Sequence, residues 1–142
     1  MPYSTRADVE SKLSRARLVE LTDDENDESQ VDARIDEAIV RADTKIDSYL
    51  RGRYEVPLIL TVQGEQDMIR DISTELTIWE LYKRRGDFLI SESTKERYRD
   101  AMKDLENIQK GKISFTVDAS PNVPKVRRTL SKTYTAEKLN QY

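Results

Sequence analysis

One acidic run in the N-terminal third of the chain has residue types that could bind a cation. Asp23, Glu25 and Asp27 alternate along the chain as the oxygen ligands of a calcium loop do. Such a loop also needs glycine at its sixth position and glutamate at its twelfth, where this chain has Glu28 and Arg34. The sequence therefore predicts no metal, and an acidic loop that faces a neighbouring subunit or another partner. Its residues are Asp23, Asp24, Glu25, Asp27 and Glu28.

Histidine and cysteine are both absent from the 142 residues. Their absence removes the usual ligands of transition metals, the commonest general base, and any disulfide or thiolate chemistry. No nucleophile elbow, phosphate-binding loop or dinucleotide fingerprint occurs in the sequence. No carboxylate lies on the apolar face of a predicted helix, where burial would raise its pKa. We therefore expect a protein that is not an enzyme and that needs no cofactor.

The net charge of −3 is unevenly distributed along the chain. Residues 119–142 contain five basic residues and one acidic residue, whereas acidic residues outnumber basic ones in residues 1–118. A basic tail could bind nucleic acid, but without a basic folded platform the affinity would be weak and sensitive to salt. A negative body with a positive tail favours contact between copies of the chain or docking on an acidic partner. Solvation of both stretches without a partner is the alternative.

The composition is that of one small domain with a thin core. Hydrophobic residues make up 37% of the chain and charged residues 36%. No apolar run approaches the roughly 18 residues that a membrane span requires. The first residues, Met1 to Ser4, lack the basic and apolar regions of a signal peptide. We therefore expect a protein that is made in the cytoplasm, does not enter a membrane, and completes its burial against neighbouring subunits.

Apolar periodicity and capping residues predict four helices. The first begins after Ser4 or Thr5. Its inward-facing residues are Val9, Leu13 and Leu18. The second begins after Ser29, ends near Gly52 and has apolar residues at steps of three and four. These residues are Val31, Ile35, Ala38, Ile39, Ala42, Ile46, Tyr49 and Leu50.

The other two helices lie beyond an extended connection at about residues 53–63, whose apolar run should lie across the bundle. The third helix, about residues 65–85, is apolar nearly all round in its second half, which is typical of a central helix. The fourth begins after Ser93 or Thr94 and ends at Gly111. The predicted fold is therefore mainly α, a small four-helix bundle.

Residues 112–118 alternate polar and apolar side chains, which is the period of a β-strand. A single strand in a helical chain must pair with the connection after the second helix, with another copy or with a different protein. From Ala119 onward, two prolines and sparse apolar residues are typical of an extended docking arm. We therefore predict a helical domain at residues 1–111 and a strand with a docking arm at residues 112–142. The candidate docking residues are Ile113, Phe115, Val117, Lys125, Val126, Arg127, Arg128, Leu130, Lys132, Tyr134, Leu139 and Tyr142.

Several short motifs occur in a fixed order along the chain. In its first half they are Met1-Pro2-Tyr3, Leu21-Thr22-Asp23-Asp24, Ile46-Asp47-Ser48-Tyr49-Leu50, Gly52-Arg53-Tyr54 and Pro57-Leu58. In its second half they are Asp71-Ile72, Leu81-Tyr82-Lys83-Arg84-Arg85, Arg97-Tyr98 and Lys110-Gly111-Lys112-Ile113-Ser114. Together they resemble the phage neck proteins first noted in Mu-like prophages, over roughly residues 1–114. The arm lies outside this pattern, so its docking on a portal is an inference from charge and composition.

The resemblance implies a head-to-tail connector, also called an adaptor or head-completion protein. Such proteins form a ring, typically of twelve copies, beneath the portal of a DNA-filled capsid. The ring extends the DNA channel without binding the genome specifically, and it offers a platform for the head-closure or tail protein below it. The implied partners are further copies of the chain, the portal protein and a neck or tail protein. The implied location is the neck of the virion.

A free-standing regulatory domain that binds protein or nucleic acid is the second hypothesis. It predicts a monomer or dimer whose affinity for DNA falls steeply with salt. A divergent enzyme or a calcium-binding module is the third. The connector hypothesis instead predicts a ring-shaped oligomer in which residues 119–142 touch the portal or a neighbouring subunit.

Overall fold

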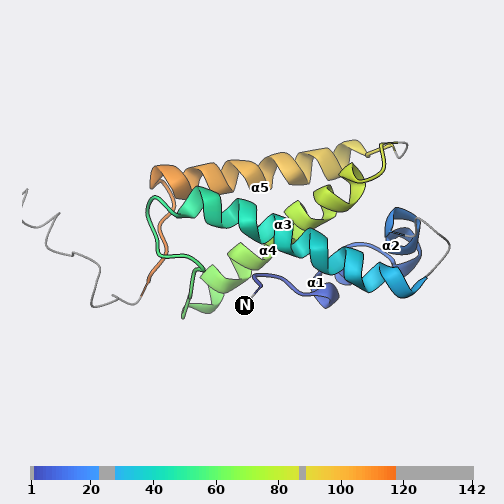
Figure 1. Ribbon diagram of the computed structural model, residues 1–142. Helices are drawn as coiled ribbons and strands as arrows, with labels where there is room; N and C mark the ends of the chain where they lie inside the picture. Colours follow the sequence, from blue (N-terminus) through green and yellow to red (C-terminus); the bar gives the residue numbers. More distant parts are fainter. Residues whose placement is uncertain (1, 23–27, 87–88, 118–142) are drawn as a thin grey trace, which may run out of the picture.

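The computed structural model describes residues 2–22, 28–86 and 89–117 (Figure 1). The elements in these ranges are α1 (Arg6–Lys12), α2 (Arg15–Thr22), a short 3-10 helix η1 (Glu28–Gln30), α3 (Val31–Leu50), α4 (Gln63–Lys83) and α5 (Glu92–Lys110). The prediction of a mainly helical protein is confirmed. The predicted count is wrong, because the described ranges contain five α-helices and the predicted first helix is divided into two.

The helix α4 is the centre of the bundle. It packs against α1, α2, α3 and α5, while α3 and α5 also contact each other. Figure 1 shows α5 running beside α3, with the short helices α1 and α2 gathered near the N-terminal end of α3. The central position agrees with the prediction, because a helix that is apolar on several sides must be covered on several sides.

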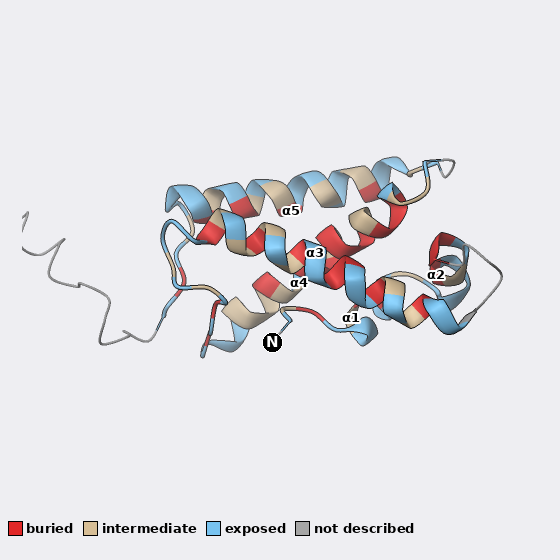
Figure 2. Ribbon diagram, in the orientation of Figure 1, coloured by how far each residue is buried: buried red, intermediate tan, exposed pale blue. Residues whose placement is uncertain are grey.

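The buried side chains form two clusters along the bundle, and the red ribbon segments in Figure 2 follow the inward faces of the long helices. One cluster joins the C-terminal half of α3, the first two thirds of α4 and the C-terminal half of α5. Its fully buried members include Ile46, Leu50, Leu76, Leu105 and Ile108. The second cluster joins α1 and α2 to the other ends of α3 and α4. Its fully buried members include Val9, Leu18, Leu21, Ile35 and Leu81.

The predicted first helix divides because its apolar residues do not all fall on one helical stripe. Val9 and Leu13 are four residues apart, but Leu18 follows Leu13 by five. The chain is extended at Leu13, with φ −125° and ψ 132°, and this residue ends α1. The turn that follows lets α2 bury Leu18 and Leu21 against the second cluster.

Two predicted helix ends are confirmed by the local geometry. Thr5 caps α1, because its side chain accepts a hydrogen bond from the Asp8 backbone N–H and the Asp8 carboxylate accepts one from the Thr5 N–H. Gly111 ends α5 in the left-handed conformation, with φ 85°. The capping residues in the sequence therefore located these two helix ends.

Two predicted caps are wrong by one to three residues. Ser29 lies inside the 3-10 turn, and Gln30 occupies the position that precedes α3. Ser91, instead of Ser93 or Thr94, caps α5 by accepting a hydrogen bond from the Thr94 N–H at 3.3 Å. Ser91 is the hydroxyl residue whose backbone is still extended, with ψ 154°, which is the conformation that a cap requires.

Replacing Gly111 should destabilise the protein more than replacing a glycine inside a helix. Gly111→Ala must adopt a positive φ, which costs an L-residue about 1–2 kcal/mol. Gly64→Ala is the matched control, because it lies in α4 with nothing within 4 Å of an added Cβ, and it should be neutral or stabilising by up to about 1 kcal/mol. Urea denaturation of both variants measures the difference, and equal effects would contradict the account of the cap.

The predicted extended connection joins α3 to α4 and lies across the bundle as expected. Leu58 and Leu60 are buried in the first cluster, while Ile59 between them is 77% exposed. This alternation is the period of an extended chain with one face on the core. The connection therefore closes one end of the bundle.

Candidate interaction surface

The predicted strand at residues 112–118 is not a strand in its described part. Residues 112 and 113 form a bend whose N–H groups donate to the Asn107 carbonyl oxygen at 2.9 and 3.2 Å, and residues 114–117 have no regular secondary structure. Phe115 is buried among residues of the first cluster and its ring centroid lies 5.9 Å from that of Tyr54. Ile113 is half-buried against the same cluster, and Val117 is 39% exposed. Of these three candidate docking residues, Val117 is the most accessible on the described surface.

Side chains, and not a second strand, accept the hydrogen bonds of the last described N–H groups of this segment. The Phe115 N–H donates to the Tyr54 hydroxyl at 2.9 Å, and the Thr116 N–H donates to the two carboxylate oxygens of Glu65 at 2.9 and 3.0 Å. The Arg53 guanidinium donates to the backbone oxygens of Ile108 and Ile113. These contacts hold the end of the described chain against the first turn of α4. The sequence reasoning did not identify Arg53, Tyr54 or Glu65 as functional residues, although two of them lie in a motif that carried the resemblance.

Most of the other candidate docking residues lie outside the described residues. This holds for Lys125, Val126, Arg127, Arg128, Leu130, Lys132, Tyr134, Leu139 and Tyr142, and for Asp23, Asp24, Glu25 and Asp27 of the acidic loop. Glu28 begins the 3-10 helix that leads into α3. The contacts predicted for the arm and for the loop therefore stay predictions.

The N-terminal segment is tied to α3 and α4 by a polar network that the sequence reasoning missed. The Tyr3 N–H donates to Asp43 at 3.1 Å, and the Tyr3 hydroxyl donates to Asp47 at 2.6 Å while it accepts from the Leu58 N–H at 2.7 Å. The Ser73 hydroxyl donates to Asp43 at 2.7 Å and lies 2.8 Å from the buried Ser4 hydroxyl. The network therefore joins the chain start, α3, α4 and the connection at one point.

Burial gives one carboxylate of this network an unusual pKa. Loss of solvent raises the pKa of Asp43, and the neighbouring Asp47 charge adds to the rise, while hydrogen bonds from Ser73 and the Tyr3 backbone oppose it. The expectation that no carboxylate is buried enough for such a shift is wrong. It failed because the N-terminal segment that covers Asp43 is 40 residues away in sequence.

The raised pKa predicts a stability that falls as the pH rises. Folding favours protonated Asp43, so its contribution is fully present below the unfolded pKa of about 4 and is lost as the pH rises through the raised pKa. Asp43→Asn should remove this loss, because its amide can accept from Tyr3 and donate to Ser73. Urea denaturation from about pH 4 to about pH 7 should show the variant gaining stability relative to the natural protein. Ser73→Ala, which removes a donor to the carboxylate, should steepen the fall, and parallel curves for all three proteins would contradict the assignment.

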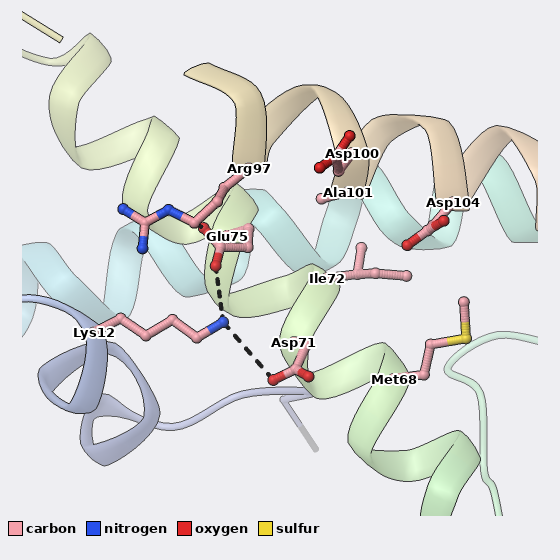
Figure 3. Close-up of a pocket in the computed structure, with 9 residues that line it drawn as sticks. All are labelled: Lys12, Met68, Asp71, Ile72, Glu75, Arg97, Asp100, Ala101 and Asp104. Carbon is pink, nitrogen blue, oxygen red and sulfur yellow. Dashed lines mark hydrogen bonds and ion pairs between the residues drawn. The ribbon is translucent and has the colours of Figure 1, made fainter. Parts of the chain in front are cut away.

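A pocket of about 250 Å³ lies between α4 and α5 and has charged residues at its rim (Figure 3). The Lys12 ammonium, from the end of α1, lies 2.8 Å from Glu75 and 3.8 Å from Asp71. The Arg97 guanidinium lies 3.9 Å from the other oxygen of Glu75. Glu75 is thus shared between two cations from different helices, and its side chain is only 11% exposed. We interpret the ion pairs at the rim of this pocket as contacts that hold α1 and α5 on α4.

No metal-binding arrangement is found in the described ranges. They contain no group of three or more acidic residues placed to hold an ion. None of the helices in these ranges combines the length and apolar character that a bilayer crossing requires.

The outward face of α3 carries an exposed apolar residue that borders two grooves. Val40, in the middle of the helix, is 63% exposed. Two grooves of about 640 and 540 Å³ share Val40 and Asp36. The larger also borders the N-terminal segment and Pro57, while the smaller borders Ala33 and Arg41. We call the residues that line these two grooves the Val40 face.

Comparison with known families decides the class of protein. A family model described as bacteriophage Mu, Gp36, matches residues 3–132. The chain belongs to the bacteriophage Mu Gp36 family. No curated protein matches it. Membership of the Gp36 family confirms the resemblance to Mu-like phage proteins, and it extends that resemblance beyond residue 114 into the first half of the basic arm.

Proposed function

We propose that this Gp36-family chain is a structural virion protein that connects the phage head to the tail. In this proposal, copies of the chain form a ring, of twelve subunits, beneath the portal. The ring extends the DNA channel and provides a platform for the next neck or tail protein. The observation that carries the proposal is the match to the Gp36 family over residues 3–132, because a fold-level likeness alone would not indicate a function.

The distribution of apolar residues supports assembly with other chains. The described bundle leaves large apolar side chains in solvent at several separate places. These are Val40, Ile59, Val62, Leu89 and Val117. Single exposed apolar residues are ordinary on a protein surface, but Val40 stands between two grooves with apolar lining. A ring would cover such a surface with neighbouring subunits.

The charges support the same arrangement. The net charge of −3 combines an acidic body with a basic segment at residues 119–142. An acidic wall does not retain phosphates, so genome DNA would pass through the ring without specific binding. The basic arm would dock on the portal or on a neighbouring subunit, and the acidic loop at residues 23–28 would face one of these partners. We propose no catalytic activity and no cofactor for this role.

Phage heads made without the protein test the proposal. Such heads should hold DNA and a portal but carry no tails, and adding the purified protein should restore tailed, infectious particles. Tailed particles that form without the protein would overturn the connector role. A gel-shift titration at two salt concentrations tests the alternative, because a free-standing nucleic-acid-binding domain would retard DNA at low salt.

A further inference from the structure

The Val40 face lies on the exposed side of α3. Val40 lies on the side of α3 opposite its buried stripe, and Thr44 follows it by one turn. In Figure 1 this helix faces the reader along most of its length, with α4 behind it. Both neighbouring grooves open beside Val40, so an apolar side chain from another segment could contact Val40 from either side.

The charges of the Val40 face are mainly negative. The charged residues that line its two grooves are Asp36, Glu37, Asp43, Asp47, Arg6 and Arg41. Arg6 is already engaged, because its guanidinium donates to both carboxylate oxygens of Asp36 at 2.8 and 2.9 Å. This pair also neutralises Asp36, and Glu37 lies 3.5 Å from the Arg34 guanidinium. Asp43 and Asp47, which accept hydrogen bonds from Tyr3, are opposed among the lining residues only by Arg41. The face therefore offers an apolar centre with a small negative excess, which suits a basic segment with apolar residues.

The basic arm of this chain has the matching chemistry. Val126, Leu130 and Tyr134 provide apolar side chains at every fourth position of this segment. The four basic residues between Pro124 and Tyr134 fall outside that spacing. They are Lys125, Arg127, Arg128 and Lys132.

We propose that residues 125–134 of one subunit bind the Val40 face of the neighbouring subunit, an inference that rests on the proposed ring. Apolar residues of the arm contact Val40, and its basic residues lie against the surrounding carboxylates. The eight residues after Val117, up to and including Lys125, can span roughly 25 Å when extended. This is close to the length of about 30 Å of the 20-residue α3, so this stretch is long enough to extend beyond a single helix of its own subunit.

This contact also explains closure of a ring. The arm and the Val40 face are different surfaces of the same chain, so the contact between two copies is heterologous. A heterologous contact repeats from each subunit to the next and closes into a ring when the rotation between copies permits. Each subunit then gives one arm and receives one.

Crosslinking in the full-length chain tests the proposal, and the natural absence of cysteine leaves a clean background. A chain carrying Thr44→Cys on the Val40 face and Ser131→Cys in the arm is treated with a short bismaleimide in portal-bound assemblies. Arms that reach the next subunit should give a ladder of covalent species beyond the dimer. The control pairs Ser131→Cys with Glu96→Cys on the exposed side of α5 and should give no ladder.

A further variant links the ladder to the chemistry of the face. Val40→Lys adds a charge of the same sign as the arm at a residue that is 63% exposed, so the ladder should be lost while the circular dichroism melting curve is unchanged. In the Thr44→Cys, Ser131→Cys chain that keeps Val40, rings of normal mass without a ladder would overturn the arm contact and leave the connector function standing. A ladder that persists in the Val40→Lys variant would overturn the role of the Val40 face. Crosslinks confined to single chains would show that the arm occupies its own subunit's face and would overturn the exchange. A protein that stays monomeric with the portal would overturn the ring and this inference together.

Discussion

Leu76→Ala lowers the free energy of unfolding by about 2–5 kcal/mol. Leu76 is 1% exposed on the central helix α4, in the cluster that joins α3, α4 and α5. The substitution removes buried methyl groups and leaves a cavity that close-packed neighbours fill only in part. Because domains of this size are stable by only about 5–15 kcal/mol, the loss is a large share of the total. Urea denaturation measures it.

Leu89→Ala is the matched control for this prediction. The chemical change is the same, but Leu89 is 97% exposed, so the free energy of unfolding should change by less than about 0.5 kcal/mol. Equal effects of the two substitutions would mean that α4 is not the centre of the core.

Deleting residues 119–142 should abolish the joining of heads to tails. The core clusters are built from residues up to Phe115, and the segment before the deletion is fixed by its own contacts to Tyr54 and Glu65. The shortened chain should therefore keep its helical circular dichroism and its denaturation midpoint. The same complementation of tailless heads measures the loss, and full restoration by the shortened protein would refute the docking role of the arm.

Removing only the charge of the arm gives a graded control. Glutamine at all five basic residues of the segment keeps its length and its apolar residues. Because the proposed contacts are ionic in part, joining should fall for this variant and should become less sensitive to salt.

The long helices could be predicted from sequence because their signals are local. The buried residues of α3 follow the predicted stripe, and Gly111 ends α5 where a positive φ is needed. The division of the first helix was harder to predict, because it depends on where Leu18 must lie in the second cluster. Local patterns gave the helices, and tertiary packing decided their exact limits.

The segment after α5 shows why the period of a sequence does not determine its partner. The alternation at residues 112–117 predicted a strand that the structure does not contain in this range, although Phe115 is buried. A strand requires a second backbone, whereas here Arg53, Tyr54 and Glu65 supply the hydrogen bonds from side chains. Those residues are about 50 to 60 positions away in sequence, so no local pattern could indicate them.

The buried network at Tyr3 was missed for a similar reason. Asp43 lies beside the apolar stripe of α3, and its charge alone suggested a solvated position. The N-terminal segment covers it, and Ser73 of α4 donates to it from the other side. The Val40 face could not be predicted either, because a groove exists only once the segments that border it have been placed.

The mass of the protein bound to its portal tests the central claim most directly. Native mass spectrometry of the purified chain, alone and with the portal, counts the subunits in each complex. The account predicts a complex in which many copies of the chain, twelve by the resemblance, accompany one portal. A single copy of the chain, both alone and in the presence of the portal, would contradict it.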